Sequence, residues 1–283
     1  MAITDNAMEQ QAYLQRELIA EPQLWRLALR VEKSALEVVL YSTIEENSLI
    51  YRHIPLVQGI DSHAKALEEA VYENPLLLSD FSRIDCVIDT DRFVVVPAEI
   101  DDPLVQEKIL KASFPEFDGQ MIANTISQQS ATILMGIDDT LLNFIRRTFN
   151  NPRISHYMSP LCRYFIYKSR QGNASKMYAH LRDNSLDLMV FANGTLRLAN
   201  TFTYREPIDA VYYIMACRQQ LSLDSADMLY VLGNGSGREE IVTMLREHIA
   251  NVMPEVFPSE MFRAGGRDAM RAPFDLIVLP LCE

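Results

Sequence analysis

Two stretches of the chain, 150 positions apart, repeat the same order of apolar and acidic residues. Leu36 to Tyr41 reads Leu-Glu-Val-Val-Leu-Tyr, and Leu186 to Phe191 reads Leu-Asp-Leu-Met-Val-Phe. Each stretch follows a short polar turn and precedes a second strand-like run, a helix-like stretch and a buried-looking strand. We interpret the repeat as two copies of one α/β unit, which predicts two lobes with a cleft between them.

The spacing of apolar and polar positions around each copy predicts the individual elements. In the first half we expect strands at 25–31, 36–42, 48–54, 86–88 and 93–96, and a helix at 62–74 capped by Asp61 or Ser62. In the middle of the chain we expect strands at 131–137 and 153–158 and helices at 103–112 and 160–170. A further helix is expected to run to 149, with Asp138 or Asp139 as its cap. In the second half we expect strands at 176–182, 186–192, 195–203, 228–232 and 275–281, helices at 207–221 and 238–250, and a loop at Gly265 and Gly266.

Both halves therefore read β-β-β-α-β, with further α and β elements following. A Rossmann domain alternates strand and helix from its start, so this order argues against one. It is the order of a ribonuclease H-like unit, and two such units in tandem form a two-lobed actin-like ATPase fold. The expected organisation is an N-terminal arm at 1–22, a first lobe with inserted α/β elements at 23–172 and a second lobe at 173–283.

The composition narrows the class of partner. Apolar residues make up 48% and charged residues 23% of the 283 positions, which is typical of a soluble globular protein with a core. The net charge of −12 argues against a nucleic-acid partner, because neutralising phosphates needs clustered lysine and arginine. The same charge argues against an anionic membrane surface, although an acidic protein can carry a local basic pocket.

The cysteines and the N-terminus indicate the compartment. Cys86, Cys162, Cys217 and Cys282 form no Cys-x-x-Cys pair, and three of them lie in apolar runs, so we expect buried, reduced thiols. No apolar run approaches the roughly 18 residues that a membrane-spanning helix needs. The first 19 residues lack the basic-then-apolar order of a secretion signal. We therefore expect a cytoplasmic protein that does not insert into membranes.

Three longer stretches carry a resemblance to a known family. They are LEVVLYSTIEENSLIYRHIPL at 36–56, DFSRIDCVIDTDRFVVVP at 80–97 and ADMLYVLGNGSG at 226–237. Together with the repeated order of elements, they make the chain similar to a bacterial family of unknown function whose members adopt an actin-like ATPase fold. The resemblance covers most of the chain from Leu24 onward. It implies the fold and assigns no reaction.

The wider actin-like superfamily implies where a nucleotide would bind. Members that bind ATP hold its phosphates with the two hairpin turns that open the two lobes, and they contact the adenosine through a glycine-rich turn in the second lobe. The residues at these places are Lys33 and Ser34 in the first hairpin, Asp183, Asn184 and Ser185 in the second, and Gly233, Asn234, Gly235, Ser236 and Gly237 in the glycine-rich turn. A helix that begins after Gly237 would favour an anion at its N-terminus.

The two hairpin turns match the superfamily poorly. The first contains no aspartate and no glycine, and the second keeps Asp183 but again lacks glycine. A Cβ atom would fill space that a phosphate needs, and Lys33 alone does not replace a cradle of backbone N–H groups. We therefore expect no catalytic residues, no bound cofactor beyond a degenerate ATP–magnesium site, and a scaffold that binds another protein and can form a homodimer. The alternative is a divergent ATP-binding protein or phosphotransferase that uses the cleft.

Other motifs have structural interpretations that we favour over functional ones. Gly233-x-Gly-x-Gly237 has its third glycine misplaced for a dinucleotide fingerprint, and a tight strand-to-helix turn explains it. Glu37 and Asp187 occupy equivalent places in the repeat, but a two-metal nuclease site would need carboxylates to converge from both lobes. His156 lies beside aromatic residues, where a histidine is usually structural. The apolar run 164–167 is expected to be a core face, or a partner surface if exposed.

Overall fold

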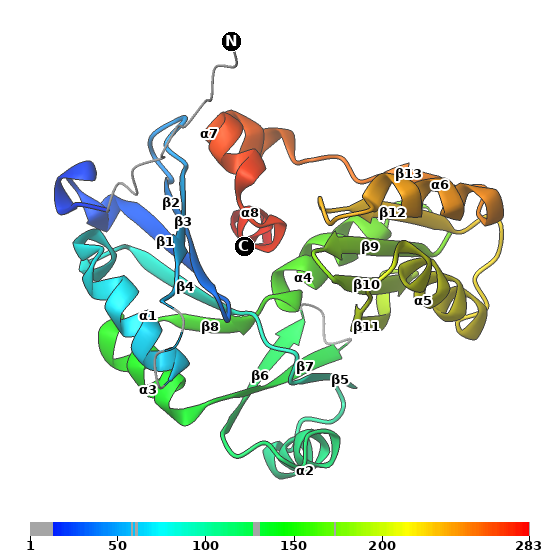
Figure 1. Ribbon diagram of the computed structural model, residues 1–283, viewed down its shortest axis with the longest axis horizontal. Helices are drawn as coiled ribbons and strands as arrows, with labels where there is room; N and C mark the ends of the chain where they lie inside the picture. Colours follow the sequence, from blue (N-terminus) through cyan, green and yellow to red (C-terminus); the bar gives the residue numbers. More distant parts are fainter. Residues whose placement is uncertain (1–13, 58, 60–61, 127–130, 173, 283) are drawn as a thin grey trace.

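The computed structural model describes residues 14–57, 59, 62–126, 131–172 and 174–282 of the chain. Two five-stranded sheets and one three-stranded sheet form its frame. Figure 1 shows the two larger sheets side by side, with α4 (Met158–Ser169) between them and the small sheet below. The predicted α/β class and the two lobes are thus present.

The first lobe is built on a sheet with the strand order β3-β2-β1-β4-β8. Its strands are β1 (Trp25–Val31), β2 (Ala35–Ser42), β3 (Ile50–Pro55), β4 (Arg83–Ile88) and β8 (Arg153–His156). The first three form an antiparallel meander, and β4 and β8 continue the sheet in parallel. Every residue of β2 is buried, as expected for a central strand that is covered on both faces.

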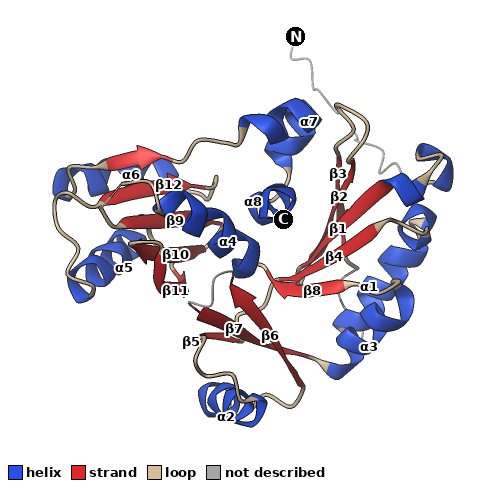
Figure 2. Cartoon of the chain, turned by 180° about the vertical axis from the view of Figure 1, so that it is seen from behind, coloured by secondary structure: helices blue, strands red, loops and turns tan. Residues whose placement is uncertain are grey.

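Two helices lie together beside this sheet (Figure 2). They are α1 (His63–Tyr72) and α3 (Asp139–Thr148), which contact each other. The side chain of Ser62 accepts a hydrogen bond from the backbone N–H of Lys65 and caps α1 as predicted, whereas the other candidate cap, Asp61, lies outside the described residues.

The second lobe repeats the strand order of the first as β11-β10-β9-β12-β13. Its strands are β9 (Lys176–Arg182), β10 (Ser185–Ala192), β11 (Thr195–Thr203), β12 (Met228–Leu232) and β13 (Val252–Pro254). The helices α5 (Pro207–Gln220) and α6 (Arg238–His248) pack against each other on this lobe. In both lobes the antiparallel meander is followed by a helix and by a parallel strand that pairs with the first strand.

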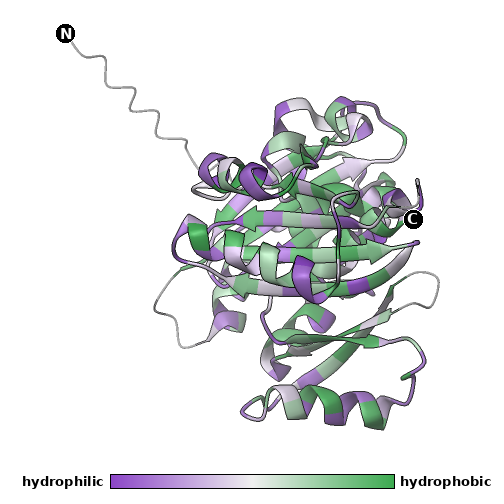
Figure 3. Ribbon diagram, turned by 90° about the vertical axis from the view of Figure 1, so that its right-hand side faces the viewer, coloured by the Kyte–Doolittle hydropathy of each residue, from purple (hydrophilic) through white to green (hydrophobic). Residues whose placement is uncertain are grey.

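A small antiparallel sheet is inserted between β4 and β8, with the order β5-β7-β6. It consists of β5 (Phe93–Pro97), β6 (Gln120–Ile126) and β7 (Ala131–Ile137), and the helix α2 (Pro103–Ser113) packs on β5 and β7. In Figure 3, α2 lies at the bottom of the view and alternates hydrophobic and hydrophilic positions, as a helix with one face on a sheet should. The sequence pattern did not predict β6.

The last part of the chain differs from the prediction. Residues 275–281 were expected to form a strand, and this is wrong, because α8 (Phe274–Val278) and a 3-10 turn at Leu279–Cys282 occupy this segment. Apart from Asp275 this run is apolar, and a short apolar run has the same composition in a buried strand and in a buried helix, so periodicity does not separate them. The expected loop at Gly265 and Gly266 lies inside α7 (Ser259–Arg271), which Gly266 kinks with a φ of 52°.

The two C-terminal helices return from the second lobe to the first. α7 contacts β3, and α8 contacts α4 and β1. Leu276, Ile277 and Val278 are fully buried and belong to the same apolar core as the first sheet. The boundaries 1–22, 23–172 and 173–283 remain a prediction, but the C-terminal segment joins the lobes physically, so the second lobe is not packed independently of the first.

The start of the described chain is attached to the first lobe. Leu14 is buried, and its backbone N–H donates a hydrogen bond to Oδ1 of Asn74 at 2.9 Å. Ile19 is buried in the same core. The remainder of the predicted arm, 1–13, lies outside the described residues.

The four cysteines, all of them among the described residues, form no disulfide with one another. Cys86, Cys162 and Cys217 are buried, as predicted, and Cys282 is partly exposed. Burial raises the pKa of the Cys86 and Cys162 thiols. These cysteines therefore serve as small apolar side chains in the core.

Candidate functional site

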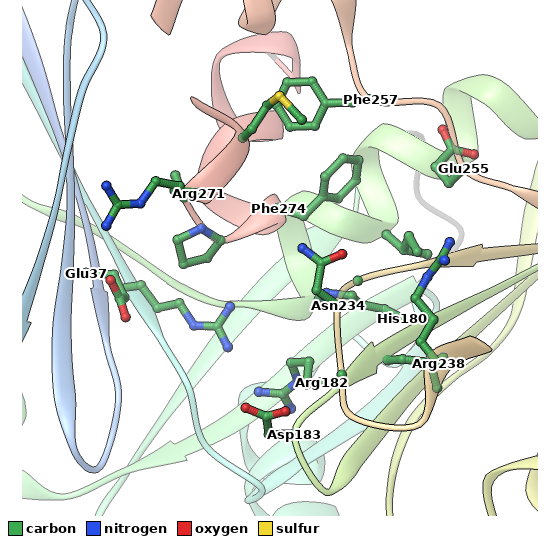
Figure 4. Close-up of a pocket in the computed structure, with 18 of the residues that line it drawn as sticks. Glu37, His180, Arg182, Asp183, Asn234, Arg238, Glu255, Phe257, Arg271 and Phe274 are labelled. Atoms are coloured by element: carbon green, nitrogen blue, oxygen red, sulfur yellow. The ribbon is translucent and has the colours of Figure 1, made fainter. Parts of the chain in front are cut away.

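A cavity of about 490 Å³ lies between the two lobes. The hairpin strands of both lobes, the glycine-rich turn after β12 and the segment from α7 to α8 contribute to its walls. Figure 4 shows Arg182, Asp183 and Asn234 on its second-lobe side, Glu37 and Arg271 on the opposite side, and Phe257 and Phe274 above. The cavity is therefore mixed in chemistry, with aromatic, acidic and basic groups.

The two hairpins carry corresponding cross-strand pairs of titratable residues. The pairing of β1 with β2 places Arg30 opposite Glu37, and the pairing of β9 with β10 places His180 opposite Asp187. Arg30 lies one residue before the end of β1, and Arg182 ends β9. Because these strands open toward the same cavity, the polar ends of the two lobes meet at its floor.

Arg30 is a buried cation that three carboxylates share. Its guanidinium forms ion pairs with Asp275, with Asp89 at 2.6 Å and with Glu32 at 2.8 Å, and only 3% of its side chain is exposed. Asp275 is fully buried in α8 and Asp89 follows β4. Arg30 thus ties the first hairpin to the C-terminal helix.

Arg182, at the end of β9, contacts one carboxylate from each lobe. It pairs with Asp187 at 3.0 Å and with Asp89 at 2.8 Å, so one oxygen of Asp89 contacts both Arg30 and Arg182. The ring of Tyr157 lies 4.6 Å from the guanidinium of Arg182 and 5.2 Å from that of Arg30. The lobes are thereby joined by an ion-pair network, which we define as Arg30, Arg182, Asp89, Asp187, Asp275 and Glu32.

Asp187 is the most completely bonded carboxylate of this network. It accepts hydrogen bonds from the hydroxyls of Tyr157 and Thr201, each at 2.9 Å, and lies 3.2 Å from Nδ1 of His180. Burial acts to raise its pKa, but the hydrogen bond from His180 and the charge of Arg182 outweigh burial and hold the pKa well below the usual range. Asp187 is therefore ionised, and both of its oxygens contact protein groups.

The other carboxylates respond to their different surroundings. Burial acts to raise the pKa of Asp89, but the adjacent cations Arg30 and Arg182 lower it overall. Burial raises the pKa of Asp275 and of Glu32, and the attraction of Arg30 offsets this only in part, since Arg30 is shared among three acids. Asp89 is therefore the firmly ionised bridge between the lobes.

The glycine-rich turn packs against the second hairpin. Gly233 has a φ of +86°, and a Cβ atom there would lie 2.1 Å from the carbonyl oxygen of Leu181. At Gly235 a Cβ atom would lie 2.6 Å from the carbonyl oxygen of Arg182, and its N–H donates to the Leu181 oxygen at 3.1 Å. These glycines allow one backbone to approach another, which is the tight-turn interpretation given above.

The structure brings together only part of the predicted site. Asp183, Gly233, Asn234 and Gly235 line the cavity. The other predicted residues, which are not among the lining residues, are Lys33, Ser34, Asn184, Ser185, Ser236 and Gly237. The carboxylate of Asp183 lies 3.4 Å from the backbone N of Ser236 and so is turned toward its own lobe. A binding role for these ten residues remains a prediction.

The residues present do not fit a nucleoside triphosphate and its magnesium ion. Lys33 is 82% exposed and lies 3.9 Å from Asp91, away from the cavity. The N–H of Glu32 is bonded to the carbonyl of Ala35 within the first hairpin. In place of a backbone cradle, the floor between the hairpins contains Arg30, Glu32 and Arg182, and the other members of the ion-pair network lie beneath them. No reaction step can be derived through ATP from these residues.

Two histidine and carboxylate motifs also have structural roles. His156 is fully buried, its Nε2 bonds the carbonyl of Thr90 at 2.9 Å, and burial lowers its pKa to about 4. Glu37 accepts hydrogen bonds from the hydroxyl of Tyr51 at 2.8 Å and from Nδ1 of His53 at 2.7 Å. Glu37 is therefore satisfied within its own lobe, and Asp187 is satisfied by groups of its own lobe together with Tyr157 of the first. These contacts support the structural interpretation of both carboxylates.

The sequence analysis missed Arg30 and Arg182, which line the cavity, and it missed Asp89 and Asp275, which pair with them. A signal was present for the two arginines, because each lies within the last two residues of a strand that leads into a hairpin turn. Nothing in the sequence connects Asp275 with Arg30, which are 245 positions apart.

The sequence matches the model of a family described as "Protein of unknown function (DUF3822)" over residues 18–252. The chain belongs to this family. The expected membership in a family of unknown function is thereby confirmed. None of the curated proteins matches the DUF3822 chain in sequence.

Solved structures confirm the actin-like fold. A protein of Bacteroides thetaiotaomicron with an actin-like ATPase fold and unknown function superposes with a TM-score of 0.79 at 23% identity, covering 93% of this chain and 98% of that one. A chain of a PilM–PilN type IV pilus biogenesis complex superposes with a TM-score of 0.52 at 14% identity, covering 92% and 98%. At these identities the likeness concerns the fold. None of the helices formed by described residues is long and apolar enough to span a bilayer.

Proposed function

We propose that this DUF3822 protein is a non-catalytic actin-like scaffold that acts through contacts with another protein. The ion-pair network is the observation that carries the proposal. In it, protein side chains occupy the floor between the two hairpins and fix the lobes together through Asp89. A scaffold needs this fixed arrangement, whereas a nucleotide clamp needs hairpin backbones that are free to contact phosphates.

The charge of the network argues in the same direction. Two guanidiniums face four carboxylates, so the cationic groups are already paired with anionic groups of the protein. A triphosphate would have to displace these pairs. Removing one partner of a buried ion pair costs about 3–5 kcal/mol, because the other partner is left as an uncompensated charge. The network therefore disfavours a polyanion in the cleft.

The fold neighbours are compatible with a scaffold. One of them belongs to a PilM–PilN type IV pilus biogenesis complex, so a protein with this fold takes part in a protein assembly. For this chain we propose a protein partner of unknown identity, with a homodimer as one form of assembly. A bacterial, cytoplasmic location and an origin of the two lobes by internal duplication belong to the same proposal.

The alternative is a divergent ATP-binding protein or phosphotransferase that uses the cavity. Asp183 and the turn from Gly233 to Gly235 do line the cavity, and Arg238 at the start of α6 lies beside them. These residues would form its nucleotide side if the alternative holds.

A thermal-shift titration separates the two functions. Magnesium-ATP at 100 times its Kd would stabilise the folded protein by about 2.7 kcal/mol, which raises Tm by several degrees. The scaffold proposal predicts no rise at millimolar magnesium-ATP beyond that produced by magnesium chloride with inorganic phosphate. A saturable rise with ATP alone would support the alternative and contradict the scaffold.

A further inference from the structure

In one segment of this acidic chain, all the charged side chains are basic. Residues 140–182 contain eight lysines and arginines and no aspartate or glutamate, in a chain of net charge −12. Three of the eight are used internally, since Lys168 pairs with Glu255, Lys176 bonds two backbone carbonyls and Arg182 belongs to the network. The other five are Arg146, Arg147, Arg153, Arg163 and Arg170.

Two of these arginines bracket the edge strand β6. Arg146, exposed near the end of α3, lies 3.5 Å from Oε1 of Gln120 at the start of β6. Arg163 of α4 donates a hydrogen bond to the carbonyl oxygen of Thr125 at 3.1 Å, near the end of β6. At about 3.4 Å per residue the two contacts are about 17 Å apart along the strand. Neither arginine forms an ion pair with any residue that the structure describes.

A third arginine lies on the neighbouring strand. Arg153 begins β8, which contacts β6, and it is exposed. The amide of Asn124 donates to the carbonyl of Ile154 and accepts from the N–H of His156, so a side chain of β6 closes the free edge of β8. The edge of β8 is therefore covered, whereas Arg163 alone among the described residues outside the small sheet bonds a backbone group on the outer edge of β6.

The register shows which backbone groups of β6 point outward. The N–H of Gly136 donates to the carbonyl of Arg92, so the even-numbered residues of β7 bond β5 and its odd-numbered residues bond β6. The residues of β6 whose backbone N–H and C=O groups point away from β7 are accordingly Met121, Ala123 and Thr125. Of their carbonyls, that of Thr125 bonds Arg163. The groups of Met121 and Ala123 have no hydrogen bond to another described residue outside the sheet.

We propose that the outer edge of β6, between Arg146 and Arg163, binds an extended acidic segment of a partner protein as a fourth strand of the small sheet. The segment pairs its backbone with Met121 and Ala123 and places carboxylates on the arginines at the two ends. Strand addition of this kind derives affinity from backbone hydrogen bonds and specificity from the flanking side chains. Guanidinium–carboxylate pairs add charge-assisted hydrogen bonds.

The chemistry of the surface favours a peptide over a nucleic acid. Nucleic-acid binding depends on neutralising many phosphates, and a chain of net charge −12 with a few arginines at one edge repels a long polyanion. An unpaired strand edge, in contrast, is specific for another polypeptide backbone. The inference gives a partner class to the proposed scaffold, but its surface is separate from the cavity between the lobes.

The test is fluorescence anisotropy with the full chain and a labelled, capped octapeptide of alternating valine and glutamate. We expect saturable binding at low salt. The variant Arg146→Glu/Arg163→Glu should weaken it by about tenfold or more, as expected for loss of two charge-assisted contacts. The matched control Arg197→Glu/Arg205→Glu changes two exposed arginines of the second lobe and should stay within about twofold. A peptide with lysine in place of glutamate should not bind.

Two further variants keep the test decisive. Ala123→Pro removes an outward N–H without breaking a bond to β7, so the sheet should persist and peptide binding should be lost. If Arg163→Glu prevents folding, Arg146→Glu/Arg153→Glu replaces it, because both residues are exposed. Absence of binding up to about 1 mM peptide, or equal binding by the β6 and control variants, overturns the proposal. Tighter binding of a single-stranded oligonucleotide that Ala123→Pro leaves unchanged also overturns it. The magnesium-ATP titration of the scaffold proposal measures binding in the cavity, whereas the peptide titration measures binding at β6. Failure of one proposal can therefore be distinguished from failure of the other.

Discussion

Replacement of Arg30 by methionine should strongly destabilise the protein. The substitution keeps a long side chain of similar length in β1 and removes the charge. Three carboxylates then lose their shared cation, and one of them, Asp275, is fully buried in α8. Removing one member of a buried ion pair costs about 3–5 kcal/mol, because the remaining charge has no compensation.

The loss can be followed through the single tryptophan. Trp25 is buried at the start of β1, the strand that also carries Arg30, so its fluorescence reports unfolding of the first sheet. Urea unfolding at pH 7 should show a free energy of unfolding lower by about 3–5 kcal/mol, and Tm should fall by about 6 °C or more. The difference should shrink at lower pH, because Asp275 and Glu32 have raised pKa values in the folded protein and protonation removes the uncompensated charge.

The matched control is Arg197→Met on β11. Arg197 is exposed and forms no ion pair with a described residue, so the free energy of unfolding should change by no more than about 0.5 kcal/mol. A loss below about 1 kcal/mol for Arg30→Met, or a loss equal to that of the control, would refute the assignment of Arg30 as the cation that holds the C-terminal helix on the first lobe.

Three other predictions concern the same region. The lowered pKa values of Asp89 and Asp187 mean that these carboxylates stabilise the fold above the ordinary carboxyl pKa, and that this stabilisation is lost as pH falls from about 4 toward 2. In urea unfolding, Asp187→Asn should therefore lower the free energy of unfolding at pH 7 and reduce its fall over this acidic range. The same fall with pH as in the wild type would argue against this role of Asp187. Gly233→Ala should destabilise the protein more than Gly172→Ala, because both positions have a φ above +80° but only at Gly233 would the added Cβ clash with Leu181. The two free energies of unfolding should differ by about 2 kcal/mol. Equal losses would show that the turn relaxes around the new side chain. Asn124→Ala should cost about 1–3 kcal/mol, measured by urea unfolding, because it leaves the carbonyl of Ile154 and the N–H of His156 without their partner; no loss would mean that β8 needs no cover at its edge.

Most strands and helices of the fold could be predicted from sequence because their apolar spacing is unambiguous. The predicted runs 131–137, 195–203 and 228–232 coincide with β7, β11 and β12. β6 was missed because it is an edge strand whose exposed positions include Gln120, Ala123 and Thr125, and these weaken the alternation of apolar and polar residues. The C-terminal helix α8 was mistaken for a strand because four of its five residues are buried, its single acidic residue Asp275 included, and it therefore has no exposed polar face.

Only part of the candidate site could be predicted from the sequence. The hairpin turns and the glycine-rich turn could be located from the repeat, and the absence of glycine in the hairpins predicts that these residues do not cradle phosphates. The ion-pair network could not be predicted, because it joins Arg30 with Asp275 and Asp89 with Arg182 across the lobes. Such contacts depend on the tertiary arrangement and leave no local pattern.

The most direct test of the central claim is a calorimetric titration of the full chain with magnesium-ATP at pH 7. The account predicts no binding heat beyond dilution up to about 1 mM nucleotide, since the floor of the cleft is filled by paired protein charges. A saturable isotherm with one site per chain, competed by ADP and weakened by Asp183→Asn, would contradict it and would make the cleft a nucleotide site.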